Sequence, residues 1–560
     1  MKLRSLLSFL AITATLLLAI AGGSLYWILS QSPLPLLQGG VNREPAAAVF
    51  VNKQAPIMLS LLVKPEQLEG FAQFSAAPGN RRRSRKELKD VEKSLLANTG
   101  LNYDAEIRPW LGNEITLAVT SLDYDRNRNN GTKPGYLLAV QAKDKELAKE
   151  YLQLSYSEEA IAGSSDLILE DYKGVKLLFK RPRRAVVNTN FLASAVVSDF
   201  VLFANDITVL REAINNIQVS DLNLKFAQSY QDALKTIPAP RIGLAYANLP
   251  ALSAWIANSA APETPEAKQS LTISLSLESR GLVAKTGLIG VSGEMPDRPA
   301  LAEPVGALAY VPSDSIFSAA GTDLQQFSTQ IESGLDAGSP LQQLLKRGIS
   351  SLEEPLGIDL TETVFSWVQG EYSIAAVPTL KKTDPDWIFV AEKIPGAESE
   401  AAIAYLDEVA KAQGYNVETL PLLNSSVTAW TKLTTTSANN QSLAQLETLV
   451  RGVHLNVEKY TLFATSVEAM SKGISAAREP LIDSEKFQQA IAALPKQNDG
   501  YFYLDWNQAE PLIEQKVPAI RVVEFAIKPI LDNLRSLTLS SQGSISGIER
   551  STAYFNLGSR

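Results

Sequence analysis

The feature that most constrains this chain is an internal repeat. Trp110 and Trp367 lie 257 positions apart (367 − 110 = 257), and each precedes a glutamate and an apolar run, in PWLGNEITLAV and SWVQGEYSIAAV. Glu114 and Glu371 coincide at this offset. Further matches follow in the same order, pairing 47–56 with 307–316, 135–152 with 386–406, 198–214 with 458–474, 241–249 with 499–507 and 270–279 with 536–545. A period of about 260 residues indicates duplication of a whole folding unit, because solenoid repeats are only about 20–50 residues long.

Each half mixes strand and helix patterns. Runs such as EITLAVTSLD and SLTISLSLES alternate with period two, which is typical of strands that bury one face. KELAKEYLQL and ITVLREAINNIQ have helical spacing, and the strands expected at 114–121 and 135–141 follow one another directly. The expected fold class is therefore α+β: two tandem duplicated domains after an N-terminal transmembrane helix. Each domain would be a mainly antiparallel sheet with helices packed on one face.

The Pro-rich stretch SGEMPDRPALAEP separates the two halves and is the best candidate for a linker. The predicted organisation is an N-terminal transmembrane anchor or signal peptide at 1–30, a tether at 31–45, a first α+β repeat at 46–291, a linker at 292–304, and a second α+β repeat at 305–560.

The N-terminus predicts a membrane segment. Lys2 and Arg4 precede the uncharged stretch 6–29, which has 24 residues (29 − 6 + 1), whereas about 20 suffice to cross the hydrocarbon core as a helix. The positive flank predicts a cytoplasmic N-terminus and an exported remainder. The alternative is a signal peptide cleaved after Ala21, where AIA fits the small-residue cleavage pattern.

Composition excludes several classes of chemistry. With no cysteine, the chain has no thiolate nucleophile, disulfide or thiolate metal site. Its single histidine, His454, rules out a multi-histidine zinc site, and no phosphate-binding or dinucleotide glycine motif occurs. The net charge of −8 argues against nucleic-acid binding. We therefore expect no cofactor and no metal.

Three features support a resemblance to a known family: the leader, the repeated strand with its tryptophan, glycine and glutamate, and the paired sequences VLFA (201–204) and TLFA (461–464). The chain resembles a family of membrane-anchored cyanobacterial proteins that is catalogued only as a domain of unknown function. This resemblance implies a cyanobacterial, membrane-associated context, with the bulk of the chain in the periplasm or the thylakoid lumen. It provides no catalytic residues.

Candidate chemical groups are few. His454 lies in a probable strand without a nucleophile nearby in sequence and is expected to be a plain strand residue. DYDRNRNNG (123–131) places Asp123, Asp125 and Asn127 at alternating positions, but Arg128 stands where a calcium loop needs glycine. We expect that stretch to be a solvated hairpin tip.

Basic residues are concentrated in the first part of the chain. Residues 1–300 carry 33 basic and 29 acidic residues, a net of +4, which leaves 19 and 31, a net of −12, for residues 301–560. The excess lies in three predicted loops, and the candidate contacts for anionic lipid or an acidic partner are Arg81, Arg82, Arg83, Arg85, Lys86, Arg126, Arg128, Lys180, Arg181, Arg183 and Arg184. The alternative is three separate solvated loops.

These observations leave three functional hypotheses. The first is a membrane-anchored, non-enzymatic binding or scaffold protein, with the membrane bound through residues 6–29 and another membrane or exported protein as partner. The second is a carboxylate-dependent envelope hydrolase of the glycosidase type, for which Glu114, Glu371 and Asp505 are the available acids. The third is a carrier that would hold an apolar ligand in a cavity.

Overall fold

The structure is a computed structural model. It describes residues 39–64, 99, 101–127, 129–161, 165–182, 191–237, 239–256, 269–278, 280–290, 301–326, 360–379, 384–394, 399–437, 444–516, 534–545 and 548–557. We call residues 39–290 the N-terminal half and residues 301–557 the C-terminal half.

Ten strands come from the described part of the N-terminal half: β1 (Ile57–Leu61), β2 (Leu111–Ser121), β3 (Gly135–Ala142), β4 (Ser165–Tyr172), β5 (Val175–Pro182), β6 (Ala193–Val197), β7 (Phe200–Ala204), β8 (Gly243–Asn248), β9 (Ser270–Glu278) and β10 (Gly281–Ile289). Ten more come from the C-terminal half: β11 (Phe317–Thr322), β12 (Glu371–Val377), β13 (Asp386–Glu392), β14 (Asn416–Leu422), β15 (Ser425–Ser437), β16 (Ala444–Val457), β17 (Tyr460–Ala464), β18 (Gly500–Asp505), β19 (Ser536–Ile545) and β20 (Ile548–Asn556).

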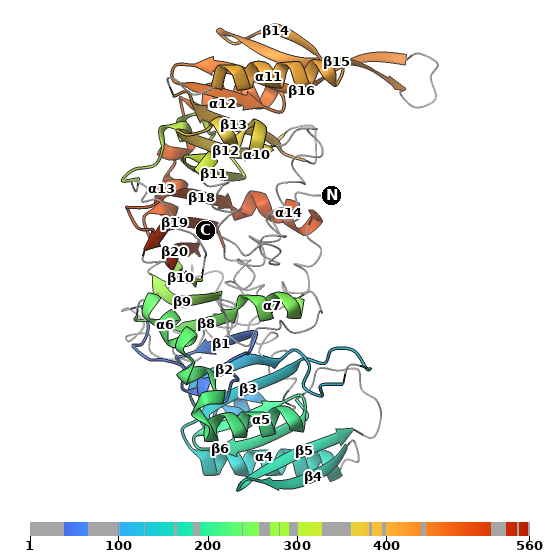
Figure 1. The fold of residues 1–560 in the computed structure, drawn as a ribbon, viewed down its shortest axis with the longest axis vertical. Coiled ribbons are helices and arrows are strands. Elements are labelled where there is room, and N and C mark those ends of the chain that lie inside the picture. Colours follow the sequence, from blue (N-terminus) through green and yellow to red (C-terminus); the bar gives the residue numbers. More distant parts are fainter. Residues whose placement is uncertain are drawn as a thin grey trace.

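These strands form one continuous antiparallel sheet that runs along the long axis of the molecule (Figure 1). The pairings give the order β4-β5-β6-β7-β3-β2-β1-β8-β9-β10 in the N-terminal half. From the other end, the order is β14-β15-β16-β17-β13-β12-β11-β18-β19-β20. The two halves therefore have the same strand order, and they join where β10 pairs with β20.

Register also agrees between the halves. Ile57 on β1 lies between Val119 and Ala247, and Phe317 on β11 lies between Ala376 and Leu504. Both partners of Phe317 are 257 positions beyond those of Ile57 (376 − 119 and 504 − 247).

The predicted fold class is wrong in its division of the sheet. The expectation was two tandem domains, each with its own sheet, whereas the described strands belong to a single sheet. The physical reason is the antiparallel pairing of β10 with β20, which satisfies the backbone groups of both strands from Gly281 to Ile289 and removes the edges that would have separated two domains.

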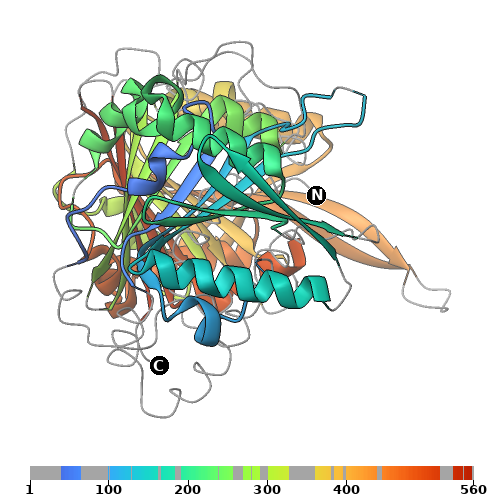
Figure 2. The ribbon, with the colours of Figure 1, turned by 90° about the horizontal axis from the view of Figure 1, so that it is seen from below.

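The helices cover both faces of this sheet rather than one (Figure 2). The described α-helices are α4 (Lys145–Ile161), α5 (Ile207–Gln218), α6 (Gln228–Thr236), α7 (Leu249–Ile256), α10 (Leu360–Thr363), α11 (Ser399–Ala412), α12 (Val467–Ala476), α13 (Glu485–Ile491) and α14 (Trp506–Lys516). The described 3₁₀ or π turns are η2 (Ala46–Val49), η3 (Tyr103–Ile107), η4 (Ser220–Leu222), η5 (Leu224–Phe226), η6 (Gly306–Tyr310), η7 (Phe365–Trp367) and η8 (Leu481–Asp483).

Alternate residues of the strands decide which helix lies on which face. On β3, Leu137 packs with α5, whereas Leu138 packs with α4. In the C-terminal half α12 and α13 share the face of α5 and α6, while α11 and α14 share the face of α4 and α7. Strands such as β7, buried at every position, therefore need apolar side chains on both sides.

The hydrophobic core crosses the junction between the halves. One cluster joins Leu275 and Leu282 of the N-terminal half to Leu537 and Phe555 of the C-terminal half, all of them buried. Burial of apolar area is the dominant favourable term in folding, so this shared cluster couples the two halves energetically.

The predicted transmembrane anchor at 6–29 and most of the tether lie outside the described residues. Among the residues that are described, no helix is long and apolar enough to cross a membrane. The predicted linker at 292–304 is described only from residue 301 onward.

Candidate functional site

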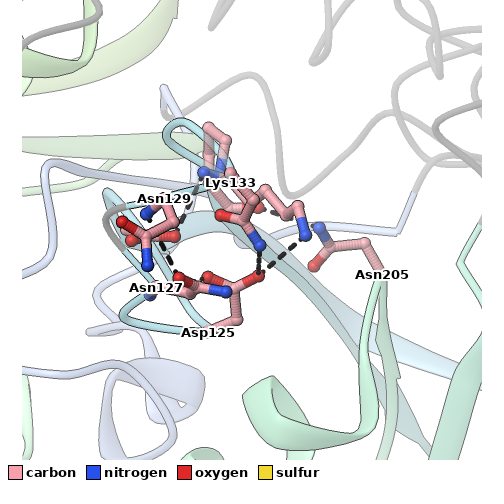
Figure 3. Close-up of polar contacts among 8 residues, drawn as sticks. Asp125, Asn127, Asn129, Lys133 and Asn205 are labelled. Carbon is pink, nitrogen blue, oxygen red and sulfur yellow. Dashed lines mark hydrogen bonds and ion pairs between the residues drawn. The ribbon is translucent and has the colours of Figure 1, made fainter.

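The loop between β2 and β3 contains DYDRNRNNG (123–131), the stretch considered above as a possible calcium loop (Figure 3). Its acidic and amide side chains bond to the loop itself. Asp125 accepts from the Asn127 N–H at 3.0 Å, and Asn127 in turn accepts from the Asn129 N–H at 3.1 Å. Asn205, which precedes α5, accepts from the Tyr136 N–H at 2.8 Å and fixes the end of the loop.

A lysine ammonium takes the place that a cation would need. Lys133 Nζ lies 2.8 Å from Asp125 Oδ2, and Asn130 Nδ2 donates to the same oxygen at 2.9 Å. The hydrogen bond from Lys133, followed by that from Asn130, holds the pKa of Asp125 well below its usual range. Among the described residues, no three His, Cys, Asp or Glu side chains are grouped so that they could hold a metal ion. The hydrogen bonds within the loop make it a self-bonded hairpin tip.

Arg126 lies in the same loop, with a side chain that is 83% exposed. Its guanidinium contacts Glu212 on α5 at 3.1 Å. Burial of Glu212 raises the pKa of that carboxyl, and the charge of Arg126 opposes the rise. Arg126 therefore lies on the surface beside α5.

Lys180 differs from Arg126 and Arg181, the other two predicted basic contacts that the structure describes, because it is buried. It lies on β5 with Nζ 4.1 Å from the centre of the Tyr156 ring of α4. Since α4 and α5 cover opposite faces, Lys180 and Arg126 point to opposite sides of the sheet. Arg181, the next residue, is exposed. The remaining candidates lie outside the described residues: Arg81, Arg82, Arg83, Arg85, Lys86, Arg128, Arg183 and Arg184.

Glu114 is a structural carboxylate. It is 1% exposed and accepts from the backbone N–H groups of Ala46 and Ala47, both at 2.8 Å, and from the Thr116 hydroxyl at 3.1 Å. These two amides begin the turn η2 and would otherwise have no helical acceptor. Burial raises the pKa of Glu114, while the amide hydrogen bonds oppose the rise. Its oxygens are therefore committed to the fold rather than open to a substrate.

Glu371, the counterpart of Glu114, has different partners. It accepts from the Tyr460 hydroxyl at 2.5 Å and lies 3.9 Å from Lys459 Nζ, which also contacts Glu392 at 2.8 Å. Burial and the bond to Glu371 raise the pKa of Tyr460. Burial also raises the pKa of Glu392, but the hydrogen bonds from the Glu371 N–H and from Lys459 outweigh it and lower that pKa overall.

This group of charges includes a cross-strand ion pair between Lys459 and Glu392. Lys459 and Glu392 occupy the places at the ends of β17 and β13 that Asp199 and Gln141 occupy beside β7 and β3, where the Gln141 amide donates to Asp199 at 3.0 Å. The same bridge thus occurs in both halves with different chemistry. Sequence reasoning missed it because its members are far apart in the chain.

The three candidate acids do not converge. Glu371 pairs with Thr322 at one end of β11, whereas Asp505 follows Leu504, which pairs with Phe317 at the other end. Six residues of strand separate them, about 20 Å at 3.3 Å per residue, and Glu114 belongs to the other half. Asp505 is buried and bonds Lys486 at 3.2 Å. A glycosidase pair at about 5–10 Å is not formed by these residues.

His454 is buried, as expected for a strand residue, but it has a partner that the sequence did not suggest. Its Nε2 lies 3.0 Å from Asp407 Oδ1 on α11, and Trp430 Nε1 donates to the same oxygen at 2.7 Å. A carboxylate can only accept, so His454 carries its proton on Nε2. The arrangement ties α11 to β15 and β16 and includes no nucleophile among its described contacts.

A shallow hollow of about 270 Å³ lies between the start of α14 and the loop after β12. Its lining combines prolines with a few polar side chains: Ile316, Pro378, Thr379, Asp384, Pro385, Asn507, Gln508, Pro511 and Leu512. An enclosed apolar cavity, as a lipid carrier would need, is not what this lining forms.

Comparison with curated proteins and with solved structures found no match. Comparison with family models found one that covers residues 10–557, described as a protein of unknown function, DUF3352. The match spans nearly the whole chain, across both halves and the junction between them, and the chain therefore belongs to the DUF3352 family of proteins of unknown function.

Proposed function

We propose that this chain is a membrane-anchored, extracytoplasmic scaffold or binding protein without a catalytic site of its own, located in the periplasm or thylakoid lumen of a cyanobacterium. The observation that carries the proposal is the commitment of Glu114, Glu371 and Asp505 to internal hydrogen bonds and ion pairs at separate places in the sheet. A long, continuous sheet with two different ends suits the binding of partners along a surface.

We further infer that the two halves descend from one duplicated unit. Their equal strand order and the common 257-residue shift of the partners of Ile57 and Phe317 support this origin. Differences between equivalent positions then report how each half has specialised. Net charge is one such difference, at +4 for residues 1–300 and −12 for residues 301–560.

The location can be tested with single cysteines, because the native chain has none. Asn129, exposed at the tip of the β2–β3 loop, is changed to Cys in the full chain, and intact cells are treated with a membrane-impermeant maleimide. We expect retention of the protein in carbonate-washed membranes. A periplasmic chain should be labelled without lysis, and a lumenal chain only after the thylakoid membrane is opened. Labelling after permeabilisation of the plasma membrane alone, with the thylakoids intact, would contradict an exported location. Release by carbonate would contradict an anchor.

The binding role is tested by crosslinking in native membranes. A photoreactive residue at position 129 is compared with one at the structurally distant position Leu423, which is 60% exposed beside β14. A partner captured reproducibly from one end and not from the other supports the scaffold. Glutamine variants of Glu371 and Glu392 that abolish a hydrolytic activity of the purified full chain would instead establish the enzyme hypothesis.

A further inference from the structure

Three large apolar side chains are exposed within eight residues of the N-terminal half. Val219 is 44% exposed, Leu222 is 40% exposed and Phe226 is 61% exposed. They lie in the connection between α5 and α6, which forms the turns η4 and η5. Scattered exposed apolar residues need no explanation, but three in one short turn form a candidate contact surface.

The turn is held firmly, so the exposure belongs to the fold. Leu224 is buried, and its N–H donates to the Val51 carbonyl at 2.8 Å. The Lys53 N–H donates to the Leu222 carbonyl at 3.0 Å, and the Asn223 side chain accepts from the Phe226 N–H at 3.2 Å. With the backbone fixed on both sides, Leu222 and Phe226 cannot turn inward without breaking these bonds.

The C-terminal half has the same turn and serves as an internal control. There, Leu481 is buried and its N–H donates to the Val311 carbonyl at 2.8 Å, which matches the bond from Leu224 to Val51. Isolated bridges join Asn52 to Asn223 and Pro312 to Pro480 at equivalent places. Counting from these residues, Glu479 corresponds to Leu222 and Asp483 to Phe226, and both acidic residues are exposed. The fold therefore does not require an apolar residue at the positions of Leu222 and Phe226.

The residues beside Leu222 and Phe226 also make the N-terminal turn more positive than its counterpart in the C-terminal half. Lys53 and Lys225 of the N-terminal half correspond to Ser313 and Ile482, and Lys225 Nζ lies 6.0 Å from the centre of the Phe226 ring. Asp221 and its counterpart Arg478 carry opposite charges, which reduces the contrast without reversing it. Over these five positions the net charge is +1 (two lysines, one aspartate) in the N-terminal half and −1 (two acids, one arginine) in the C-terminal half.

We propose that this surface, formed by Val219, Leu222 and Phe226 with Lys53 and Lys225, inserts into the headgroup region of an anionic bilayer. Apolar and aromatic side chains beside lysines are the composition that binds such an interface. A short tether would keep the N-terminal half close to the membrane. Nine residues (30–38) separate the apolar stretch 6–29 from Gly39, so the tether reaches about 30 Å at most. The proposal deepens the proposed function, since it assigns the N-terminal half to the membrane and leaves the acidic half facing away.

The test uses one environment-sensitive dye on a single cysteine of the full chain. Ser220→Cys places the dye in the turn, and Asp483→Cys places it at the matched exposed turn of the C-terminal half. The proteins are studied with vesicles of phosphatidylcholine and phosphatidylserine that contain a lipid-borne quencher. We expect a blue-shifted, quenched dye at position 220 and a water-like, unquenched dye at position 483. Water-like emission at both positions, or equal quenching at both, would overturn the proposal.

A second variant separates insertion from mere proximity. Leu222→Glu with Phe226→Asp gives the N-terminal half the residues of the C-terminal half at sites already compatible with the fold, and it should remove most of the quenching at position 220. Unchanged quenching would overturn insertion, and equal quenching in pure phosphatidylcholine would overturn the part assigned to the lysines. Dye shielded in native membranes without lipid quenching would identify a protein as the occupant and overturn the lipid assignment.

These results are independent of the anchor. Carbonate extraction tests whether the leader holds the chain in the membrane, whereas quenching reports lipid contact of the turn. If extraction shows an anchor and the dye stays in water, the surface proposal fails and the scaffold proposal stands. If the leader is cleaved and vesicles still quench the dye, the surface proposal stands and the anchor fails.

Discussion

Lys285 on β10 pairs with Thr552 on β20 at the centre of the strand pair that joins the two halves. Ile289 ends β10 opposite Ser270, and Asn556 ends β20 opposite Ser536, so Ile289 and Asn556 are equivalent. Lys285 and Thr552 each lie four residues before these ends (289 − 285 and 556 − 552), which makes them equivalent and opposite one another. A local twofold axis therefore passes between them, and β10–β20 has the geometry of a symmetric dimer contact built into one chain.

Because the sheet and its central core are shared, the halves should unfold together. Leu282 on β10 is fully buried in the cluster that also contains Phe555. Leu282→Ala should lower the free energy of unfolding by about 2–5 kcal/mol, the usual cost of a truncation in a packed core. Urea unfolding followed by dyes in each half should shift equally for both. Leu154→Ala, at a position 55% exposed on α4, is the control. Two separate transitions would contradict this coupling.

Glu114 should make stability depend on pH in an unusual direction. Burial raises the pKa of this carboxyl above its ordinary value of 4.5. The folded state then binds the proton more tightly than the unfolded state, so its contribution to stability is complete below the ordinary value and is lost as pH rises through the raised pKa. Glu114→Gln should remove this loss, so the variant gains stability relative to the native chain as pH increases.

The measurement is urea unfolding from pH 4 to pH 8, with Glu158→Gln on the exposed surface of α4 as the matched control. Glu114→Ala should cost at least about 2 kcal/mol at any pH in this range, since the amides of Ala46 and Ala47 lose their acceptor. A difference between Glu114→Gln and the native chain that does not vary with pH would contradict the assignment.

Asp407 should matter as an acceptor more than as a charge. Its Oδ1 receives both His454 Nε2 and Trp430 Nε1. Asp407→Ala leaves two largely buried donors without a partner and should cost about 2–4 kcal/mol, whereas Asp407→Asn keeps an acceptor and should cost less. As His454 is the single histidine of the chain, its ring nitrogens give isolated NMR signals. They should show the proton on Nε2, and a proton on Nδ1 in the neutral ring would contradict the described geometry.

Periodicity predicted the local elements well. The strands expected at 114–121 and 135–141 correspond to Leu111–Ser121 and Gly135–Ala142, and the helical spacing of KELAKEYLQL corresponds to Lys145–Ile161. Periodicity could not predict that the two halves join. The alternating pattern of β10 and β20 indicates which of their residues are buried, but it does not indicate which strand pairs with each of them. Helices on both faces had a readable signal: FVLFA (200–204) is apolar at every position, which is typical of a strand buried on both sides.

For the candidate sites too, the sequence indicates which way a side chain points but not which residues it contacts. Glu114 alternates with Thr116 and Ala118 along β2, so its inward direction follows from period two, but its partners lie 67 and 68 residues away and are set by tertiary structure. The exposed apolar surface at Leu222 and Phe226 is recognised only by comparison with Glu479 and Asp483, and the structure is needed to show that these residues are equivalent. Sequence matching at the level of whole segments does not resolve that turn.

Lys180 should behave as a core residue although it belongs to a basic run. Its ammonium lies against the Tyr156 ring, and the strand alternation places it beside Leu178 on the face covered by α4. Lys180→Ala should therefore lower the free energy of unfolding by about 1–2 kcal/mol through lost packing and cation–π attraction, and it should leave vesicle binding unchanged. Arg181→Ala, at the exposed neighbouring position, should change stability by less than about 0.5 kcal/mol. Urea unfolding and vesicle flotation of the two variants provide the comparison. If Lys180→Ala lost lipid binding without losing stability, Lys180 would be a lipid contact, as the sequence predicted, rather than a core residue.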